Sequence, residues 1–138
     1  MTKAIRATVA AAALMTMAGL AACNADHGAF EQVTADQLAT MMNGDPQIVV
    51  CDANSKGVRE EYGTIPGAVL LSSYSFEASE LPGDKAASLV FYCSSERCSA
   101  APRAAERAQN AGFQRVYVMP EGIKGWVKAG KPVDEFKG

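Results

Sequence analysis

The segment from residue 89 to residue 100 reads Leu89-Val90-Phe91-Tyr92-Cys93-Ser94-Ser95-Glu96-Arg97-Cys98-Ser99-Ala100. Its first four residues form a continuous apolar and aromatic run, which is typical of a strand buried on both faces of a parallel sheet. Small and polar residues follow Cys93, and an alanine-rich stretch with helical spacing begins directly after them. The segment therefore predicts a buried strand that delivers a cysteine to a short loop, which leads straight into a helix.

The predicted loop has the features of an anion site around the Cys93 sulfur. Ser99 is placed to cap the following helix, and Pro102 falls in its first turn, where a missing N–H costs nothing. The loop amides and the helix N-terminus would converge on Cys93 and lower the pKa of its thiol by stabilising a thiolate or a persulfide. We expect Cys93 on a surface loop outside the core. The alternative is a small buried cysteine at a strand end.

Strands and helices alternate on both sides of this segment. The sequence predicts further strands at residues 30–33, 47–52, 68–71 and 115–119, and helices at 35–42, 57–62, 99–111 and 123–129. Thr34 and Gln37 match a capping box before the first helix, and Gly44 lies beyond its end. This alternation predicts an α/β domain with a central parallel sheet of about five strands and helices on both faces. Ligands bind such sheets beyond the carboxyl ends of the strands, where Asp52 and Cys93 lie.

Composition excludes several classes of function. The chain has 138 residues, 49% of them hydrophobic, which suits one domain with its own core. A net charge of −2 gives no reason to expect nucleic acid as a partner. The single histidine, His27, precedes the predicted domain, so we expect no Cys–His dyad or triad. Cys51, Cys93 and Cys98 without a nearby histidine make a poor metal site, so we expect no metal and no cofactor, and Cys51 should be inert.

The N-terminus reads as an export signal. Lys3 and Arg6 precede a small and apolar run at residues 7–20, which predicts a signal peptide at 1–22. Leu20-Ala21-Ala22-Cys23 resembles the bacterial lipobox, so we expect Cys23 to be acylated as the mature N-terminus; an ordinary signal that leaves Cys23 free is the alternative. Residues 23–29 would form a tether, 30–134 the domain and 135–138 a tail. The expected location is the periplasm, with the outer membrane favoured and membrane contact through the lipid alone.

Three segments resemble the rhodanese (sulfurtransferase) family over residues 30–133. Val49-Val50-Cys51-Asp52-Ala53-Asn54 resembles the family's strand that ends in Asp-x-Arg, and Tyr62-Gly63-Thr64-Ile65-Pro66-Gly67-Ala68 resembles its Gly-His-Ile-Pro-Gly-Ala motif. The loop from Cys93, together with residues 112–119 and 122–126, resembles the family's C-terminal half. The resemblance implies a rhodanese-like fold.

The same resemblance implies sulfur transfer. Cys93 would attack a small sulfur donor such as thiosulfate, form a persulfide and pass the sulfur to a thiol or cyanide acceptor, with a periplasmic protein as a further candidate partner. Asp52 matches the family's structural aspartate at the strand end. The loop cradle and substrate-binding positions carried over with Cys93 are Ser94, Ser95, Glu96, Arg97, Cys98 and Ser99.

The sequence departs from the family at three positions. Asn54 and Thr64 replace an arginine and a histidine that brace the site, and Cys98 replaces the loop arginine five residues after the nucleophile. Arg97 offers a positive charge one residue earlier, but we expect doubly charged thiosulfate to be used inefficiently. Cys98 is also a candidate redox partner, because a loop that bends back would bring the two Cα atoms within roughly 6 Å. The alternative is that Cys98 merely fills the arginine position.

Three other functions compete with sulfur transfer. A phosphatase or arsenate reductase of related fold carries arginine six residues after the cysteine, and here that position is Ser99. A periplasmic thiol–disulfide protein would use Cys93 and Cys98. A non-catalytic rhodanese-fold binding module is disfavoured by the intact Cys93.

Overall fold

A computed structural model describes residues 30–138 of the chain. The predicted signal peptide at 1–22, the acylation of Cys23 and the tether at 23–29 lie outside the described residues. Over residues 30–138, every helix falls short of the length and hydrophobicity that a membrane-spanning segment needs.

The centre of the structure is a parallel sheet of five strands in the order β1-β5-β4-β2-β3. The strands are β1 (Glu31–Gln32), β2 (Ile48–Asp52), β3 (Val69–Leu70), β4 (Ser88–Tyr92) and β5 (Arg115–Val118). All five residues of β4 are buried, because β2 and β5 pair with its two edges and helices cover its two faces. The prediction of a parallel sheet from the apolar runs is confirmed.

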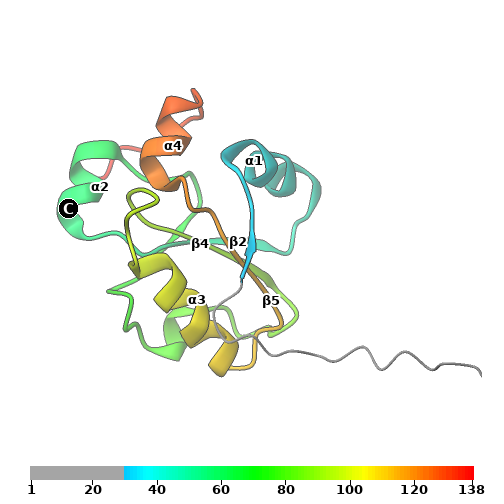
Figure 1. The fold of residues 1–138 in the computed structure, drawn as a ribbon. Helices are drawn as coiled ribbons and strands as arrows, with labels where there is room; N and C mark the ends of the chain where they lie inside the picture. The colour runs from blue at the N-terminus through cyan, green and yellow to red at the C-terminus, as the bar shows by residue number, and fades with distance from the viewer. Residues whose placement is uncertain (1–29) are drawn as a thin grey trace, which may run out of the picture.

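Helices cover both faces of this sheet (Figure 1). On one face lie α1 (Ala35–Gly44), α2 (Lys56–Tyr62) and α4 (Gly122–Lys128), which pack against Val50, Val90 and Tyr92. On the other face lies α3 (Ala100–Asn110), which packs against Leu89 and Phe91 together with the loop that contains the 3₁₀ helix η1 (Ala78–Glu80). Alternate residues of β4 therefore belong to different halves of the core, as the period of a strand requires.

The predictions for three helix ends have different outcomes. The capping box is confirmed, since the Thr34 hydroxyl accepts from the Gln37 amide at 3.1 Å and the Gln37 side chain accepts from the Thr34 amide at 2.8 Å. Gly44 is the last residue of α1 instead of lying beyond it. Ser99 does precede α3, but its helical φ of −91° and ψ of −2° leave its side chain without a capping hydrogen bond. A side-chain cap needs extended backbone geometry at that position, so the prediction for Ser99 is wrong.

The inward face of α3 is made of alanines. The buried ones are Ala101, Ala104, Ala105 and Ala108, whereas Ala100 and Ala111 at the two ends are half-buried. Alanine at all four buried positions lets the helix axis approach the sheet closely. Gly112, two residues beyond the end of α3, has a φ of +101°, which glycine adopts readily where a helix stops.

Candidate functional site

Cys93 lies at the carboxyl end of β4, in the middle of the sheet. The strand ends at Tyr92, and the loop from Cys93 to Ser99 leads into α3. The side chain of Cys93 is buried, with 3% of the residue exposed, and it packs in the core beside α3. The prediction of a surface position outside the core is therefore wrong: the loop is at the surface, but its first residue points into the domain.

Helix α4 holds the first part of the loop in place. The Ile123 amide donates to the Cys93 carbonyl at 2.8 Å, and the Lys124 amide donates to the Ser94 carbonyl at 3.1 Å. Gly122 makes this approach feasible, since its φ is +63° and a Cβ built there would lie 2.5 Å from the Ser94 carbonyl carbon. The α4 N-terminus therefore fixes the backbone that carries Cys93.

Cys98 and Cys93 form a disulfide in this structure. Their Cα atoms lie 6.3 Å apart, inside the range that a disulfide spans. The Cys98 amide donates to the Ser95 carbonyl at 3.0 Å, and this turn folds the end of the loop back over Cys93. The predicted proximity of the two cysteines is therefore observed.

The other predicted loop residues surround this pair unevenly. Ser94 and Ser95 are half-buried, whereas Glu96, Arg97 and Ser99 are exposed. Within residues 30–138, no loop amide donates to the Cys93 sulfur, which lies 3.5 Å from the Cys98 carbonyl oxygen. Because this sulfur is bonded to Cys98, the cradle around a free anion stays a prediction.

Two cavities meet at the Cys98 side of the loop. A narrow one of about 150 Å³ is lined by both cysteines, with Glu96 as its charged residue. A wider one of about 420 Å³ is lined by Cys98 and by neutral side chains that include Asn54 and Tyr74. Arg97 lines neither; it faces a separate hollow beside α4. Among the described residues, no basic side chain lines either cavity at the cysteines.

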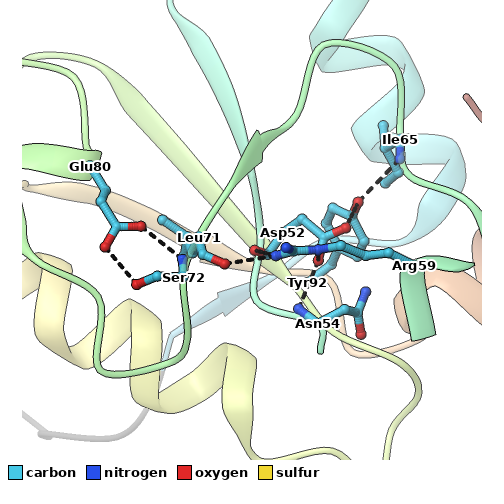
Figure 2. Close-up of polar contacts among 8 residues, drawn as sticks. All are labelled: Asp52, Asn54, Arg59, Ile65, Leu71, Ser72, Glu80 and Tyr92. Atoms are coloured by element: carbon cyan, nitrogen blue, oxygen red, sulfur yellow. Dashed lines mark hydrogen bonds and ion pairs between the residues drawn. The ribbon is translucent and has the colours of Figure 1, made fainter. Parts of the chain in front are cut away.

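Asp52 lies at the carboxyl end of β2, where it is fully buried and serves the framework of the site. Its carboxylate accepts from the Tyr92 hydroxyl at 2.6 Å and from the backbone amide of Asn54 at 2.7 Å (Figure 2). The Tyr92 hydroxyl in turn accepts from the Ile65 amide at 3.1 Å. Burial, followed by the nearby Asp52 charge, raises the pKa of Tyr92 far above its usual value. Tyr92 therefore stays protonated and ties the strand ends to the turn at Ile65.

Arg59 completes this framework, and the sequence reasoning missed it. From α2 its guanidinium reaches the Asp52 carboxylate at 3.3 Å, the Asp52 carbonyl at 3.0 Å and the Leu71 carbonyl at 2.8 Å (Figure 2). It thus supplies an arginine close to the position where Asn54 stands in place of the family's arginine. The signal available in the sequence was Arg59 itself, a basic residue in the short helix predicted at 57–62, directly after the Asp52 strand.

The departures from the family at Asn54 and Thr64 have separate consequences. The Asn54 side chain is buried, and its Nδ2 is the one buried side-chain N or O without a partner within residues 30–138. Thr64 keeps the turn in place through its backbone, which exchanges two hydrogen bonds of 2.9 Å with Asp134. Main-chain pairing therefore holds the turn at Thr64 in place.

Glu80 braces the rim of the wider cavity. Its carboxylate accepts from the Ser72 amide at 2.8 Å and the Ser72 hydroxyl at 2.7 Å (Figure 2). It also accepts from the Glu77 amide at 2.9 Å. These hydrogen bonds, that of the Ser72 hydroxyl first, lower the pKa of Glu80, so it stays ionised. Ser72 lines the cavity, and its position is fixed by this carboxylate.

Cys51 is a structural residue, as predicted. It is fully buried in the middle of the sheet and remains a free thiol. Burial, and next the charge of Asp52, raise its pKa to about 12. Within residues 30–138, no three histidine, cysteine or acidic side chains gather in a way that could hold a metal ion.

Comparisons with known proteins agree with this geometry. The model of the family described as "Rhodanese-like domain" matches residues 34–129. A search of curated proteins gives no significant match.

Three solved structures illustrate the likeness in fold. The rhodanese-like domain of an Anabaena protein is 19% identical with a TM-score of 0.65, and the match covers 76% of this chain and 79% of that one. Thiosulfate sulfurtransferase from Pseudomonas aeruginosa is 18% identical with a TM-score of 0.64, over 78% of this chain and 21% of that one. A Rhodopseudomonas palustris protein described as "Possible Tyrosine Phosphatase" is 22% identical with a TM-score of 0.61, over 76% and 85%.

Proposed function

Since the chain belongs to the rhodanese-like domain family, we propose that it is a sulfurtransferase whose sulfur carrier is Cys93. The observation that carries this proposal is the position of Cys93, where the central strand β4 ends and the loop to α3 begins. The α4 amides hold the Cys93 and Ser94 carbonyls, so the loop backbone is fixed before any donor binds. A nucleophile on such a rigid support meets its substrate in one geometry.

The reaction requires Cys93 as a free thiolate, so the bond to Cys98 is reduced first. The thiolate then attacks the outer sulfur of thiosulfate, the S–S bond of the donor breaks, and sulfite leaves with its bonding electron pair. Cys93 now carries a persulfide. A thiol acceptor or cyanide attacks the outer sulfur of that persulfide, and Cys93 leaves as the thiolate, which completes the cycle.

The preferred donor is expected to carry less negative charge than thiosulfate. The narrow cavity at Cys93 has Glu96 as its charged residue, and Arg97 faces a different hollow. A negative charge beside the sulfur repels a dianion. Uncharged or singly charged persulfides are therefore the favoured donors, whereas thiosulfate should react more slowly and still load Cys93 fully when it is in excess.

The test of this proposal is turnover by reduced protein with thiosulfate and either cyanide or a thiol. The variant Cys93→Ser should show no turnover above the uncatalysed reaction. Cys51→Ala is the matched control, because it removes a buried thiol that lies outside both cavities, and it should retain activity. Equal turnover by Cys93→Ser and the wild type would refute the proposal.

A second candidate function is thiol–disulfide exchange by Cys93 and Cys98. The specific observation in its favour is the disulfide between them. Oxidation of a dithiol substrate by the oxidised protein, without any sulfane sulfur donor, is its signature. A phosphatase is disfavoured because Ser99 stands at the position that an oxyanion-binding arginine would need.

We also propose that the domain is anchored in the periplasm by a lipid on Cys23. The lipobox-like residues 20–23 support this, and they lie outside the described residues. Fractionation of a bacterial host that expresses the chain should find wild type in the membrane and Cys23→Ala in the soluble periplasm. Membrane association of both proteins to the same extent would contradict the anchor.

A further inference from the structure

The position of Cys98 gives it access that Cys93 lacks. Cys98 is half-buried and lines both the narrow cavity of about 150 Å³ and the wider one of about 420 Å³. Cys93 is 3% exposed and lines the narrow cavity alone. A bulky thiol that enters through the wider cavity therefore meets the sulfur of Cys98 before that of Cys93.

The backbone brings the two sulfurs together without relying on the bond between them. The turn from the Cys98 amide to the Ser95 carbonyl, at 3.0 Å, folds the loop back, while the α4 amides hold the Cys93 and Ser94 carbonyls. The Cα atoms of the two cysteines consequently lie 6.3 Å apart. Such a loop presents Cys98 to whatever sulfur Cys93 carries, and a reaction within one loop is favoured over attack by a thiol from solution.

We propose that Cys98 is an internal acceptor, which makes this protein a persulfide reductase that releases hydrogen sulfide. This inference rests on the proposed function, because it needs a persulfide on Cys93. The Cys98 thiolate attacks the inner sulfur, which is Sγ of Cys93, and a Cys93–Cys98 bond forms. The outer sulfur takes up a proton from solvent, the bond between it and Cys93 breaks, and it leaves as hydrosulfide with the bonding electron pair.

The cycle closes with a dithiol reductant. One of its thiolates attacks Sγ of Cys98 through the wider cavity, and Cys93 leaves as a thiolate. The second thiol of the reductant then displaces Cys98 and closes a disulfide of its own. Two electrons pass from the dithiol to the outer sulfur, which leaves as hydrosulfide, and the protein returns to its starting state.

Cys51 takes no part in these steps. It is fully buried and lines neither cavity at the cysteines. The high pKa that burial gives its thiol, about 12, keeps it protonated at neutral pH. The sulfide-releasing step therefore depends on Cys98 alone, and it can be removed without touching the sulfur carrier.

The test is a single turnover without oxygen or added thiol. Wild type, Cys98→Ser and Cys93→Ser are reduced with dithiothreitol, desalted and mixed with thiosulfate; released sulfite, released sulfide and intact protein mass are then measured. Wild type should release one equivalent each of sulfite and sulfide and lose the mass of two hydrogen atoms. Cys98→Ser should release sulfite alone and gain the mass of one sulfur atom, and Cys93→Ser should release neither ion.

The outcomes separate the two claims. If wild type keeps the added sulfur and releases sulfite without sulfide, the internal acceptor is refuted while sulfur transfer stands. If Cys98→Ser releases no sulfite, the sulfurtransferase proposal fails and the further inference fails with it. Sulfide release by Cys98→Ser at the wild-type level also overturns the role of Cys98.

Discussion

Replacing Arg59 by methionine tests whether a guanidinium from α2 stabilises the strand ends around the site. Methionine keeps most of the apolar stem but removes the three contacts to the Asp52 carboxylate, the Asp52 carbonyl and the Leu71 carbonyl. The Arg59 and Asp52 side chains are 10% and 0% exposed, so solvent screens the ion pair little. The variant leaves a buried carboxylate without its cation.

The expected loss in the free energy of unfolding depends on the hydrogen bonds that Asp52 keeps. Breaking a buried pair from one side costs about 3–5 kcal/mol. Asp52 keeps its hydrogen bonds from the Tyr92 hydroxyl and the Asn54 amide, which places Arg59→Met towards the lower end of this range. We expect the free energy of unfolding to fall by about 3 kcal/mol.

The assay is urea unfolding of the oxidised protein, followed by the fluorescence of the buried Trp126. Lys56→Met is the matched control, because it removes a cation from the same helix whose side chain is 67% exposed and whose partner is Glu60. Exposed pairs of this kind contribute about 0.3–0.5 kcal/mol. A loss below about 1 kcal/mol for Arg59→Met, or a loss equal to that of Lys56→Met, would show that the pair is not part of the framework.

Three further predictions concern the loop and the core. Cys98→Arg should raise turnover with thiosulfate about 10- to 100-fold, because a charge-assisted contact is worth roughly 1.5–3 kcal/mol, and steady-state kinetics that show no gain refute it. Raising the pH above about 9 should lower the free energy of unfolding by about 1.4 kcal/mol per pH unit, since the folded Cys51 thiol keeps its proton to a pKa of about 12 while the unfolded thiol loses it near 9.0. This part of the slope should vanish in Cys51→Ala when urea midpoints are compared across pH. Gly122→Ala should cost about 1–3 kcal/mol in the same assay, because its Cβ meets the Ser94 backbone at 2.5 Å, and Gly130→Ala, with a φ of +73° and open space around it, should cost less.

The fold could be predicted because its signals are local. The apolar runs at 47–52 and 88–92 match β2 and β4, and the capping box at Thr34 marks the start of α1. Helix and strand periods decide such elements without knowledge of distant contacts. Errors are confined to the ends, where Ser99 has helical backbone angles and Gly44 joins the helix.

The site was predicted less completely because its contacts join distant parts of the chain. Burial of Cys93 depends on how α3 packs against the sheet, which the pattern of the loop alone does not reveal. The role of Arg59 depends on α2 lying over the ends of β2 and β3, so that one guanidinium reaches both Asp52 and Leu71. The departure at Asn54 was visible in the sequence, but the contacts of Arg59 with Asp52 and Leu71 became visible only in the structure.

The central claim is that Cys93 carries the transferred sulfur, and locating that sulfur tests it most directly. Reduced Cys98→Ser protein is treated with thiosulfate, its thiols and persulfides are alkylated, and the digested peptides are weighed. The account predicts one additional sulfur atom on the peptide that contains Cys93 and none on the peptide that contains Cys51. An unmodified Cys93 peptide, or an extra sulfur found on Cys51 in its place, would contradict it.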